Sequence, residues 1–235
     1  MLELHPTAMA HGGEAVARKD GKAHFIAGAM PGEVVEAAVT EDRGSWARAR
    51  LVSIIEPSPL RQDPPCPHAH VCGGCQWQHA DRDVQLGWKH DIVVSQLSHL
   101  GRMEDPPVGP TIAPGPSLGY RNRMDFHVTY GRAGLMRHRS NDVVPLDSCP
   151  LLDPILQPIF DRLGDLRGVD RITLRCGIRT GDVVIIVDGD VPDHAASWGA
   201  PVLRRERSKA VPVIGDAKLV EVVDDTPFAI PFTGF

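Results

Sequence analysis

Four cysteines constrain the fold of this chain more than any other feature of its sequence. Three of them lie within ten residues, in the run CPHAHVCGGC, and the fourth stands far downstream, directly before a proline; they are Cys66, Cys72, Cys75 and Cys149. Thiolate sulfur selects zinc, copper(I) or iron–sulfur clusters, and converging thiolates can hold either a tetrahedral zinc ion or a four-iron four-sulfur cluster. If these cysteines share one site, the fold must bring two distant segments together.

The spacing of the cysteines favours a cluster over zinc. Structural zinc sites usually take their cysteines from two short knuckles, whereas here a triplet with gaps of five and two residues is joined by one remote cysteine. Gly73 and Gly74 allow the backbone to approach sulfide closely. A zinc site completed by His68 and His70, without Cys149, is the alternative.

Closely spaced cysteines can also form disulfide bonds. The sequence has no secretory signal at its start, and a fifth cysteine makes the count odd, so we expect a reducing, cytoplasmic location. The fifth, Cys176, stands in RITLRCGI, where apolar residues alternate with polar or small ones. This period is typical of a strand with one buried face, so we expect Cys176 to be a core residue and not a nucleophile.

Charge separates one segment from the rest of the chain. The net charge of −5 argues against a protein that binds nucleic acid over its whole surface, and no stretch is long enough to span a membrane. Between residues 121 and 139, however, arginines gather around a single acid, Asp125, and such a cluster can neutralise phosphates. The alternative is a solvated strand pair. The predicted RNA contacts are Arg121, Asn122, Arg123, Arg132, Arg137 and Arg139.

The first third of the chain has the pattern of a small barrel. Short alternating segments with glycine punctuation follow one another as EAVAR, KAHFIAGAMPGE, EVVEAAVT and WARARLVSII. In the last of these, alanine and leucine alternate with Arg48 and Arg50, which predicts one apolar and one basic face. We therefore expect an OB-like barrel over residues 1–58, whose curved face can hold single-stranded nucleic acid; a barrel without a ligand is the alternative.

A second domain is predicted over residues 59–235. It begins with a proline-rich boundary and the cysteine loop at 66–75, followed by a helix capped by Asp81 and ended by Gly101. A proline-rich linker at 104–119 precedes an arginine-rich hairpin, a short helix after Cys149 and further strands around 171–178, 182–188 and 218–223. The predicted fold class is therefore mainly β with α+β: an OB-like barrel followed by an antiparallel α+β domain.

Several segments together resemble RNA uracil-5-methyltransferases. GGEAVARKDGKAHFIAGAMPGEVVEAAV is similar to a TRAM domain, a small RNA-binding barrel, and CPHAHVCGGCQWQHADRDVQLGWK, GYRNRMDF and DSCPLLDP follow in the order expected of that family. The resemblance implies that Cys66, Cys72, Cys75 and Cys149 ligate a structural four-iron four-sulfur cluster. It also implies methyl transfer from S-adenosylmethionine to carbon 5 of a uridine in ribosomal or transfer RNA, with a single-stranded loop as the expected element.

The same resemblance implies groups that the sequence does not show. The family uses a cysteine nucleophile in a Ser-Cys-Asn-Pro-like loop, a carboxylate base and a doubly wound cofactor domain, and no matching loop or glycine-rich turn is found. We assign no catalytic and no S-adenosylmethionine-binding residue. Since the sequence stops at Phe235, we expect a fragment without the doubly wound methyltransferase domain. In this interpretation the chain is the RNA-recognition portion, inactive alone, and a separate catalytic chain is a candidate partner.

Three other functions fit parts of the pattern. An iron–sulfur electron carrier requires the short gaps of ferredoxins, which the isolated Cys149 does not provide. Radical chemistry on S-adenosylmethionine, suggested because TRAM barrels also occur in methylthiotransferases, requires three cysteines spaced three and two apart. A zinc-stabilised RNA-binding protein would use the histidines of the cysteine loop.

Overall fold

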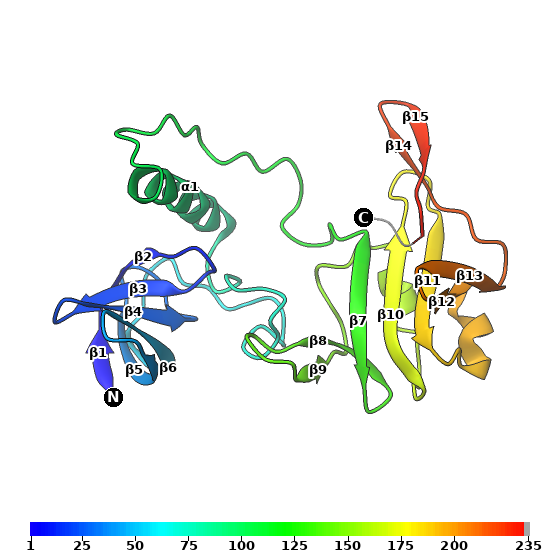
Figure 1. Cartoon of the computed structure of the whole chain (residues 1–235), viewed down its shortest axis with the longest axis horizontal. Helices are drawn as coiled ribbons and strands as arrows, with labels where there is room; N and C mark the ends of the chain where they lie inside the picture. Colours follow the sequence, from blue (N-terminus) through cyan, green and yellow to red (C-terminus); the bar gives the residue numbers. More distant parts are fainter. Residues whose placement is uncertain (233–235) are drawn as a thin grey trace. The chain divides into compact units, whose positions relative to one another are not determined.

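The chain forms two compact units in a computed structural model that describes residues 1–232 (Figure 1). Unit 1 comprises Met1–His70 and Cys75–Pro114, and unit 2 comprises Val71–Gly74 and the chain from Gly115 onward. The sequence pattern placed a boundary after residue 58. That domain division stays a prediction. Unit 1 extends beyond the barrel because later residues, including Ala80 and Trp88, belong to the same buried cluster as the barrel strands.

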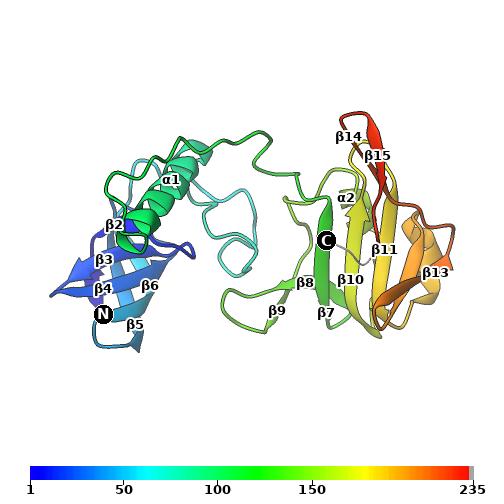
Figure 2. The same ribbon diagram turned by 45° about the horizontal axis from the view of Figure 1, so that its top comes forward.

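Unit 1 is built on a curled six-stranded sheet (Figure 2). Its strands are β1 (Leu2–Leu4), β2 (Pro6–Met9), β3 (Ala15–Lys19), β4 (Lys22–Ala27), β5 (Val34–Asp42) and β6 (Trp46–Glu56). They lie in the order β1-β5-β6-β4-β3-β2, with β4 and β6 parallel and the other neighbours antiparallel. The Lys19 Nζ donates a hydrogen bond to the Glu3 carbonyl oxygen at 3.1 Å, which links β3 to β1 across the curl.

Small side chains line the interior of this sheet. Alternate residues of the strands are buried, and many of them are alanines; the fully buried ones include Ala15, Ala17, Ala37 and Ala47. Larger apolar residues such as Ile26 complete the core. Short and long side chains alternate in this way where a sheet curls tightly around a narrow interior. The predicted strands and the predicted inward and outward alternation are confirmed.

Helix α1 (Arg82–His99) follows the cysteine segment as predicted. The Asp81 carboxylate accepts a hydrogen bond from the Asp83 backbone N–H at 2.8 Å, a typical N-cap. Trp88 is buried against the barrel core, with Val84 and Ile92 partly buried beside it. No helix among residues 1–232 is both long and apolar enough to cross a membrane.

The proline-rich segment after α1 has no regular secondary structure, in agreement with the linker prediction. Its first half runs back along the helix, since the Thr111 hydroxyl donates to the Leu86 carbonyl oxygen at 3.0 Å. The Arg82 guanidinium likewise donates to the Ala113 carbonyl oxygen at 3.1 Å. The first residues of this linker therefore belong to unit 1.

Unit 2 is built on a seven-stranded sheet with the order β13-β12-β11-β10-β7-β8-β9 (Figure 1). The strands are β7 (Arg123–Thr129), β8 (Arg132–Met136), β9 (Val143–Pro145), β10 (Val169–Cys176), β11 (Val183–Gly189), β12 (Val202–Glu206) and β13 (Lys209–Ile214). The helix α2 is a single turn, Gln157–Phe160. A separate hairpin, β14 (Val220–Val223) and β15 (Thr226–Ala229), follows the sheet.

This sheet is mixed, which corrects the prediction of an antiparallel domain. Strands β11 and β12 are parallel and are connected through the 3₁₀ helix η1 (Asp193–Trp198). The crossover is anchored by Trp198, which is fully buried and donates from its indole nitrogen to the Leu163 carbonyl oxygen at 3.0 Å. Strands β12 and β13 were not predicted, because their sequences carry several charged residues and Pro212. A proline is tolerated there because β13 is an edge strand.

Both faces of the sheet in unit 2 carry apolar side chains. On one face Phe126 packs against Phe160, with ring centroids 4.9 Å apart. Cys176 lies in this unit's core at 2% exposure, so the prediction of a core residue is confirmed. On the opposite face Ile186 and Leu203 form a smaller buried cluster with further residues of the C-terminal segment.

Candidate functional site

The four candidate ligands are distributed over both units. Cys66 and Cys75 belong to unit 1, whereas Cys72 and Cys149 belong to unit 2. All are thiols and not disulfides; Cys149 is buried and the other three are partly buried. Over residues 1–232 the structure shows no three or more histidine, cysteine, aspartate or glutamate side chains grouped so that they could hold a metal ion. The ligand set therefore stays a prediction.

In unit 1 the cysteine segment is tied to the barrel. The Trp77 indole nitrogen donates to the Gly13 carbonyl oxygen at 3.0 Å. Gly13 has a positive φ of 90°, and a Cβ there would lie 3.0 Å from the Gln76 Cβ, so only glycine fits comfortably. The Cys66 backbone N–H in turn donates to the Gln78 side-chain oxygen at 3.1 Å. These contacts hold the segments on both sides of the cysteine loop.

In unit 2 the loop Val71–Gly74 is held at the end of β8. The Gly73 backbone N–H donates to the Met136 carbonyl oxygen at 2.9 Å, and Cys72 forms a β-bridge with Arg137. A Cβ on Gly73 would lie 2.8 Å from that same carbonyl oxygen. The structure thus gives a reason for this glycine that the sequence did not: it allows close approach of two backbones. The Gly74 N–H also donates to the Cys72 Sγ at 3.3 Å.

Cys149 starts a loop that pairs with the segment before β7. The Gly119 N–H donates to the Pro150 carbonyl oxygen and the Arg121 N–H to the Leu151 carbonyl oxygen, both at 2.8 Å. The motifs GYRN and DSCPLLDP, far apart in the sequence, therefore lie side by side in unit 2. This pairing fixes the backbone on which Cys149 is buried.

Cys176 does not act as a nucleophile in this environment. Burial raises the pKa of its thiol to about 12, and the negative charges of Asp153 and Glu221 act in the same direction. A thiol with such a pKa is protonated at neutral pH and reacts poorly. This agrees with its position on the buried face of β10.

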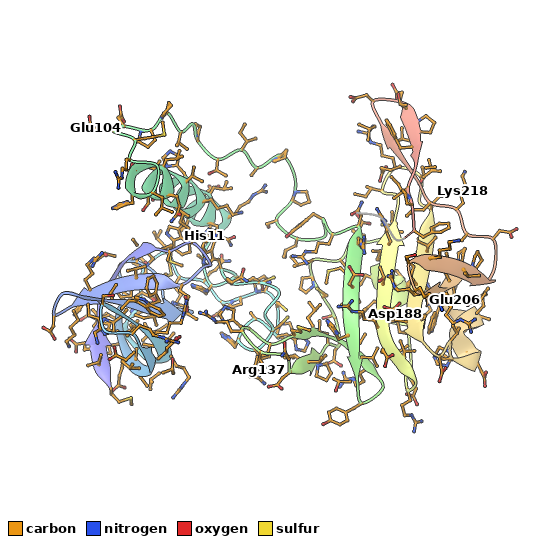
Figure 3. The ribbon with its side chains drawn as sticks, viewed as in Figure 1. His11, Glu104, Arg137, Asp188, Glu206 and Lys218 are labelled. Atoms are coloured by element: carbon orange, nitrogen blue, oxygen red, sulfur yellow. The ribbon has the colours of Figure 1, made fainter. Side chains whose placement is uncertain are left out.

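The predicted arginine contacts are spread over two ends of the β7–β8 hairpin. Arg137 is exposed just beyond β8, beside the cysteine loop of unit 2 (Figure 3), and Arg139 is exposed in the following turn. Arg132 begins β8 and pairs with Asp147. At about 3.3 Å per residue along a strand, Arg132 stands roughly 16 Å from Arg137. These side chains therefore do not form one compact patch.

The remaining predicted contacts are partly engaged within unit 2. The Arg121 guanidinium lies 3.9 Å from the Met124 sulfur, and the Asn122 carbonyl oxygen accepts a hydrogen bond from the Cys176 N–H at 2.8 Å. The Arg123 guanidinium pairs with the Asp125 carboxylate at 3.2 Å. The exposed cations among the six are thus Arg132, Arg137 and Arg139, and Arg132 pairs with Asp147.

A polar row on β7 and β10 was missed from the sequence. Arg171, Thr173 and Arg175 occupy every second position of β10 and pair in register with residues of β7. The Thr173 hydroxyl donates to the Asp125 carboxylate at 2.6 Å. Burial works to raise the pKa of Asp125, but this hydrogen bond and the Arg123 guanidinium hold it below its ordinary value. The alternation in RITLRC, used only to place Cys176, also contained the signal for this row.

Comparison with known proteins identifies the first domain and several relatives. Residues 5–52 match the TRAM domain, which confirms the TRAM part of the prediction. The chain is 38% identical over 212 residues to a 23S rRNA (uracil(1939)-C(5))-methyltransferase of Photorhabdus laumondii, a match that covers 84% of this chain and 45% of that protein. It is 37% identical over 208 residues to an uncharacterized RNA methyltransferase of Gloeobacter violaceus, covering 78% of this chain and 45% of that protein. The chain is also 32% identical over 230 residues to an uncharacterized RNA methyltransferase of Corynebacterium diphtheriae, a match that covers 96% of this chain and 53% of that protein.

A solved structure shares the fold. The crystal structure of the Pyrococcus abyssi tRNA (uracil-54, C5)-methyltransferase in complex with S-adenosyl-L-homocysteine matches 99% of this chain and 60% of its own, with a TM-score of 0.71 and 20% sequence identity. The chain spans about half the length of the three relatives named above. The described residues therefore share the fold of the matched 60% of the Pyrococcus abyssi chain.

These matches correct three predictions. The predicted fold class described the chain as a fragment without its methyltransferase domain. This prediction is overturned, because 99% of the chain matches the solved structure of a methyltransferase. The function of a non-catalytic RNA-recognition portion is overturned by the same match and by the names of the relatives. A separate catalytic chain finds no support. All three predictions were drawn from motifs that were not found and from where the sequence stops, which are weak grounds. Residues 5–52 are a TRAM domain, in a chain whose sequence and fold are similar to those of RNA uracil-C5-methyltransferases.

Proposed function

We propose that the protein is an RNA uracil-C5-methyltransferase, which transfers a methyl group from S-adenosylmethionine to carbon 5 of a uridine in ribosomal or transfer RNA. The observation that carries this proposal is the 38% identity over 212 residues to a protein named as a 23S rRNA uracil-C5-methyltransferase. The TRAM domain at residues 5–52 and the fold shared with a tRNA uracil-C5-methyltransferase support it.

The contribution of unit 2 to RNA binding rests on its accessible cations. Arg137 is exposed beyond β8, where it can neutralise a phosphate. Arg123 and Arg132 are already paired with carboxylates, so a phosphate must compete with those partners. We expect replacement of Arg137 by alanine to weaken RNA binding more than replacement of Arg132. Equal losses would contradict this ranking.

We further propose that Cys66, Cys72, Cys75 and Cys149 ligate a four-iron four-sulfur cluster with a structural role. Four thiol side chains are the donor set that such a cluster takes, and the hydrogen-bonded segments around Cys66, Cys72 and Cys149 hold their backbones in place. When bound, the cluster would supply cross-links between distant segments, so that its loss and unfolding are coupled. The same thiols would stay reduced in the cytoplasm, where we place the protein.

Replacement of Cys149 tests the ligand set. In protein purified without oxygen we expect about four irons and four sulfides per chain for the wild type, as a cube of this type contains. We expect a severe loss of iron in Cys149→Ala and no loss in the matched control Cys176→Ala, since Cys176 lies in the core. Full metal occupancy in Cys149→Ala would refute this ligand set. Bound zinc in place of iron would favour the zinc site with His68 and His70.

The methyl transfer itself is tested with radiolabelled S-adenosylmethionine. The protein is incubated with the labelled donor and with ribosomal RNA or transfer RNA that lacks modifications, and the RNA is then digested to nucleosides. The proposal predicts label in 5-methyluridine from one of the two RNA classes. Label in another nucleoside, or no transfer to either class, would overturn it.

A further inference from the structure

The outer face of the barrel carries two aromatic rings and an arginine in contact. The Phe25 and Trp46 ring centroids lie 6.0 Å apart with an interplanar angle of 80°, an edge-to-face pair. The Arg48 guanidinium carbon lies 4.9 Å from the Trp46 ring centroid, within the range of a cation–π contact. The parallel pairing of β4 with β6 places Phe25 opposite Arg48, so the three side chains form one continuous surface.

Strand alternation directs these side chains away from the barrel core. Along β4 the neighbours of Phe25, His24 and Ile26, are buried, and along β6 the neighbouring alanine Ala47 is buried between Trp46 and Arg48. Phe25, Trp46 and Arg48 are each only partly buried. Neither aromatic belongs to the buried cluster of unit 1 or to the apolar residues packed against it. Core packing therefore does not account for two large rings at this position.

Charges around the rings are arranged in two zones. The Glu14 carboxylate lies 3.3 Å from the Arg48 guanidinium and the Glu41 carboxylate 3.1 Å from it. These acids hold the guanidinium beside the indole and make this spot unfavourable for a phosphate. Arg18 and Arg50, by contrast, are exposed on the same outer face at its margins. The centre of the face thus suits a planar, uncharged group, and its margins suit anions.

We propose that Phe25, Trp46 and Arg48 form a stacking platform for an unpaired RNA base, with Arg18 and Arg50 available to the flanking phosphates. This inference rests on the proposed function in that it takes RNA as the partner. Aromatic rings and guanidinium planes stack on any base, because every base has a π-face. The platform therefore recognises single-stranded RNA as such and does not select a sequence.

The affinity of the full chain for a fluorescently labelled oligouridylate, measured by fluorescence anisotropy, tests the platform. Stacking of one base contributes about 1–3 kcal/mol, so we expect Phe25→Ala and Trp46→Ala each to weaken binding about 5-fold to 150-fold. Phe228→Ala is the matched control, since Phe228 is a half-exposed aromatic on the β15 strand of unit 2; its affinity should equal that of the wild type. Phe25→Leu keeps an apolar side chain without a ring and should also bind weakly.

Salt dependence separates stacking from phosphate contacts. We expect the platform variants to keep the wild-type slope of log affinity against log salt, and Arg18→Ala and Arg50→Ala each to reduce that slope by about 0.7. Wild-type affinity in folded Phe25→Ala and Trp46→Ala, or no binding of the oligouridylate by the wild type, would overturn the platform. The methyl-transfer assay decides the proposed function separately, since a chain that binds through the platform but transfers no methyl group refutes only the function.

Discussion

A buried ion pair in unit 1 allows a quantitative prediction. Glu33, at the turn before β5, is 2% exposed. Its carboxylate accepts hydrogen bonds from the Arg61 Nε at 2.5 Å, from the Arg61 Nη2 at 2.9 Å and from the Met30 backbone N–H at 2.9 Å. Arg61 also donates to the Gly28 carbonyl oxygen at 2.7 Å. The pair therefore fastens the proline-rich segment that leads to Cys66 onto the barrel.

Removing both partners should cost less than the sum of the two single losses. Breaking a buried pair leaves an uncompensated charge and costs about 3–5 kcal/mol. Arg61→Ala leaves the buried Glu33 carboxylate with backbone donors alone, those of Met30 and Ser58, so we expect about 3 kcal/mol of lost stability. Glu33→Ala should cost about 2 kcal/mol, because the Arg61 side chain is 19% exposed and keeps its bond to Gly28. The double variant should be less destabilised than the sum by about 2 kcal/mol.

Urea unfolding followed by tryptophan fluorescence measures this coupling. Three of the four tryptophans, Trp46, Trp77 and Trp88, lie in unit 1, so the signal reports mainly on that unit. Burial works to raise the pKa of Glu33, but the Arg61 guanidinium and the Met30 N–H hold it below its ordinary value of 4.5. The stabilisation is therefore complete above pH 4.5 and is lost as the pH falls further through the lowered pKa. A coupling energy below about 0.5 kcal/mol at pH 7, or one that does not change at acid pH, would refute the reasoning.

Three further predictions follow from single positions. In Gly73→Ala the new Cβ meets a backbone carbonyl oxygen at 2.8 Å, so we expect the cysteine loop to leave the end of β8 and the iron content to fall. Gly109→Ala, which meets nothing within 4 Å, should keep its iron; equal iron in both variants would count against the close approach. Trp198→Phe loses the hydrogen bond to the Leu163 carbonyl oxygen, which still has His194 as a partner at 2.9 Å, and should cost about 0.5–1.5 kcal/mol in urea unfolding; an unchanged midpoint would show that this bond adds nothing. Cys176, with a pKa of about 12, should resist alkylation at pH 8 until the protein unfolds, as mass spectrometry can show; rapid labelling of the native protein would contradict its burial.

Much of unit 1 could be predicted from the sequence because its signals are local. The alternation along β3 to β6 and the cap at Asp81 each follow from a few neighbouring residues. The boundary of the unit could not be predicted in this way. It depends on the packing of Trp88 against the barrel strands, a contact between segments that no local pattern reveals.

Unit 2 shows where local patterns are insufficient. The parallel pairing of β11 with β12 depends on the burial of Trp198 in the crossover, and the edge position of β13 permits a proline that a central strand would not. The candidate site was likewise predicted only in part. The cysteines were identified by residue type and spacing, whereas the separation of Arg132 from Arg137 required the register of the β7–β8 hairpin. The outer aromatic surface of the barrel also depends on strand pairing, since Phe25 and Trp46 meet only across β4 and β6.

The release of tritium from RNA that carries the label at carbon 5 of its uridines tests the central claim most directly. A methyl group at carbon 5 replaces the hydrogen at that position, so each transfer must liberate one labelled hydrogen to water. If the protein is a uracil-C5-methyltransferase, tritium release should require S-adenosylmethionine and should equal the 5-methyluridine formed. Methylation of the RNA without tritium release would place the methyl group elsewhere and contradict the account.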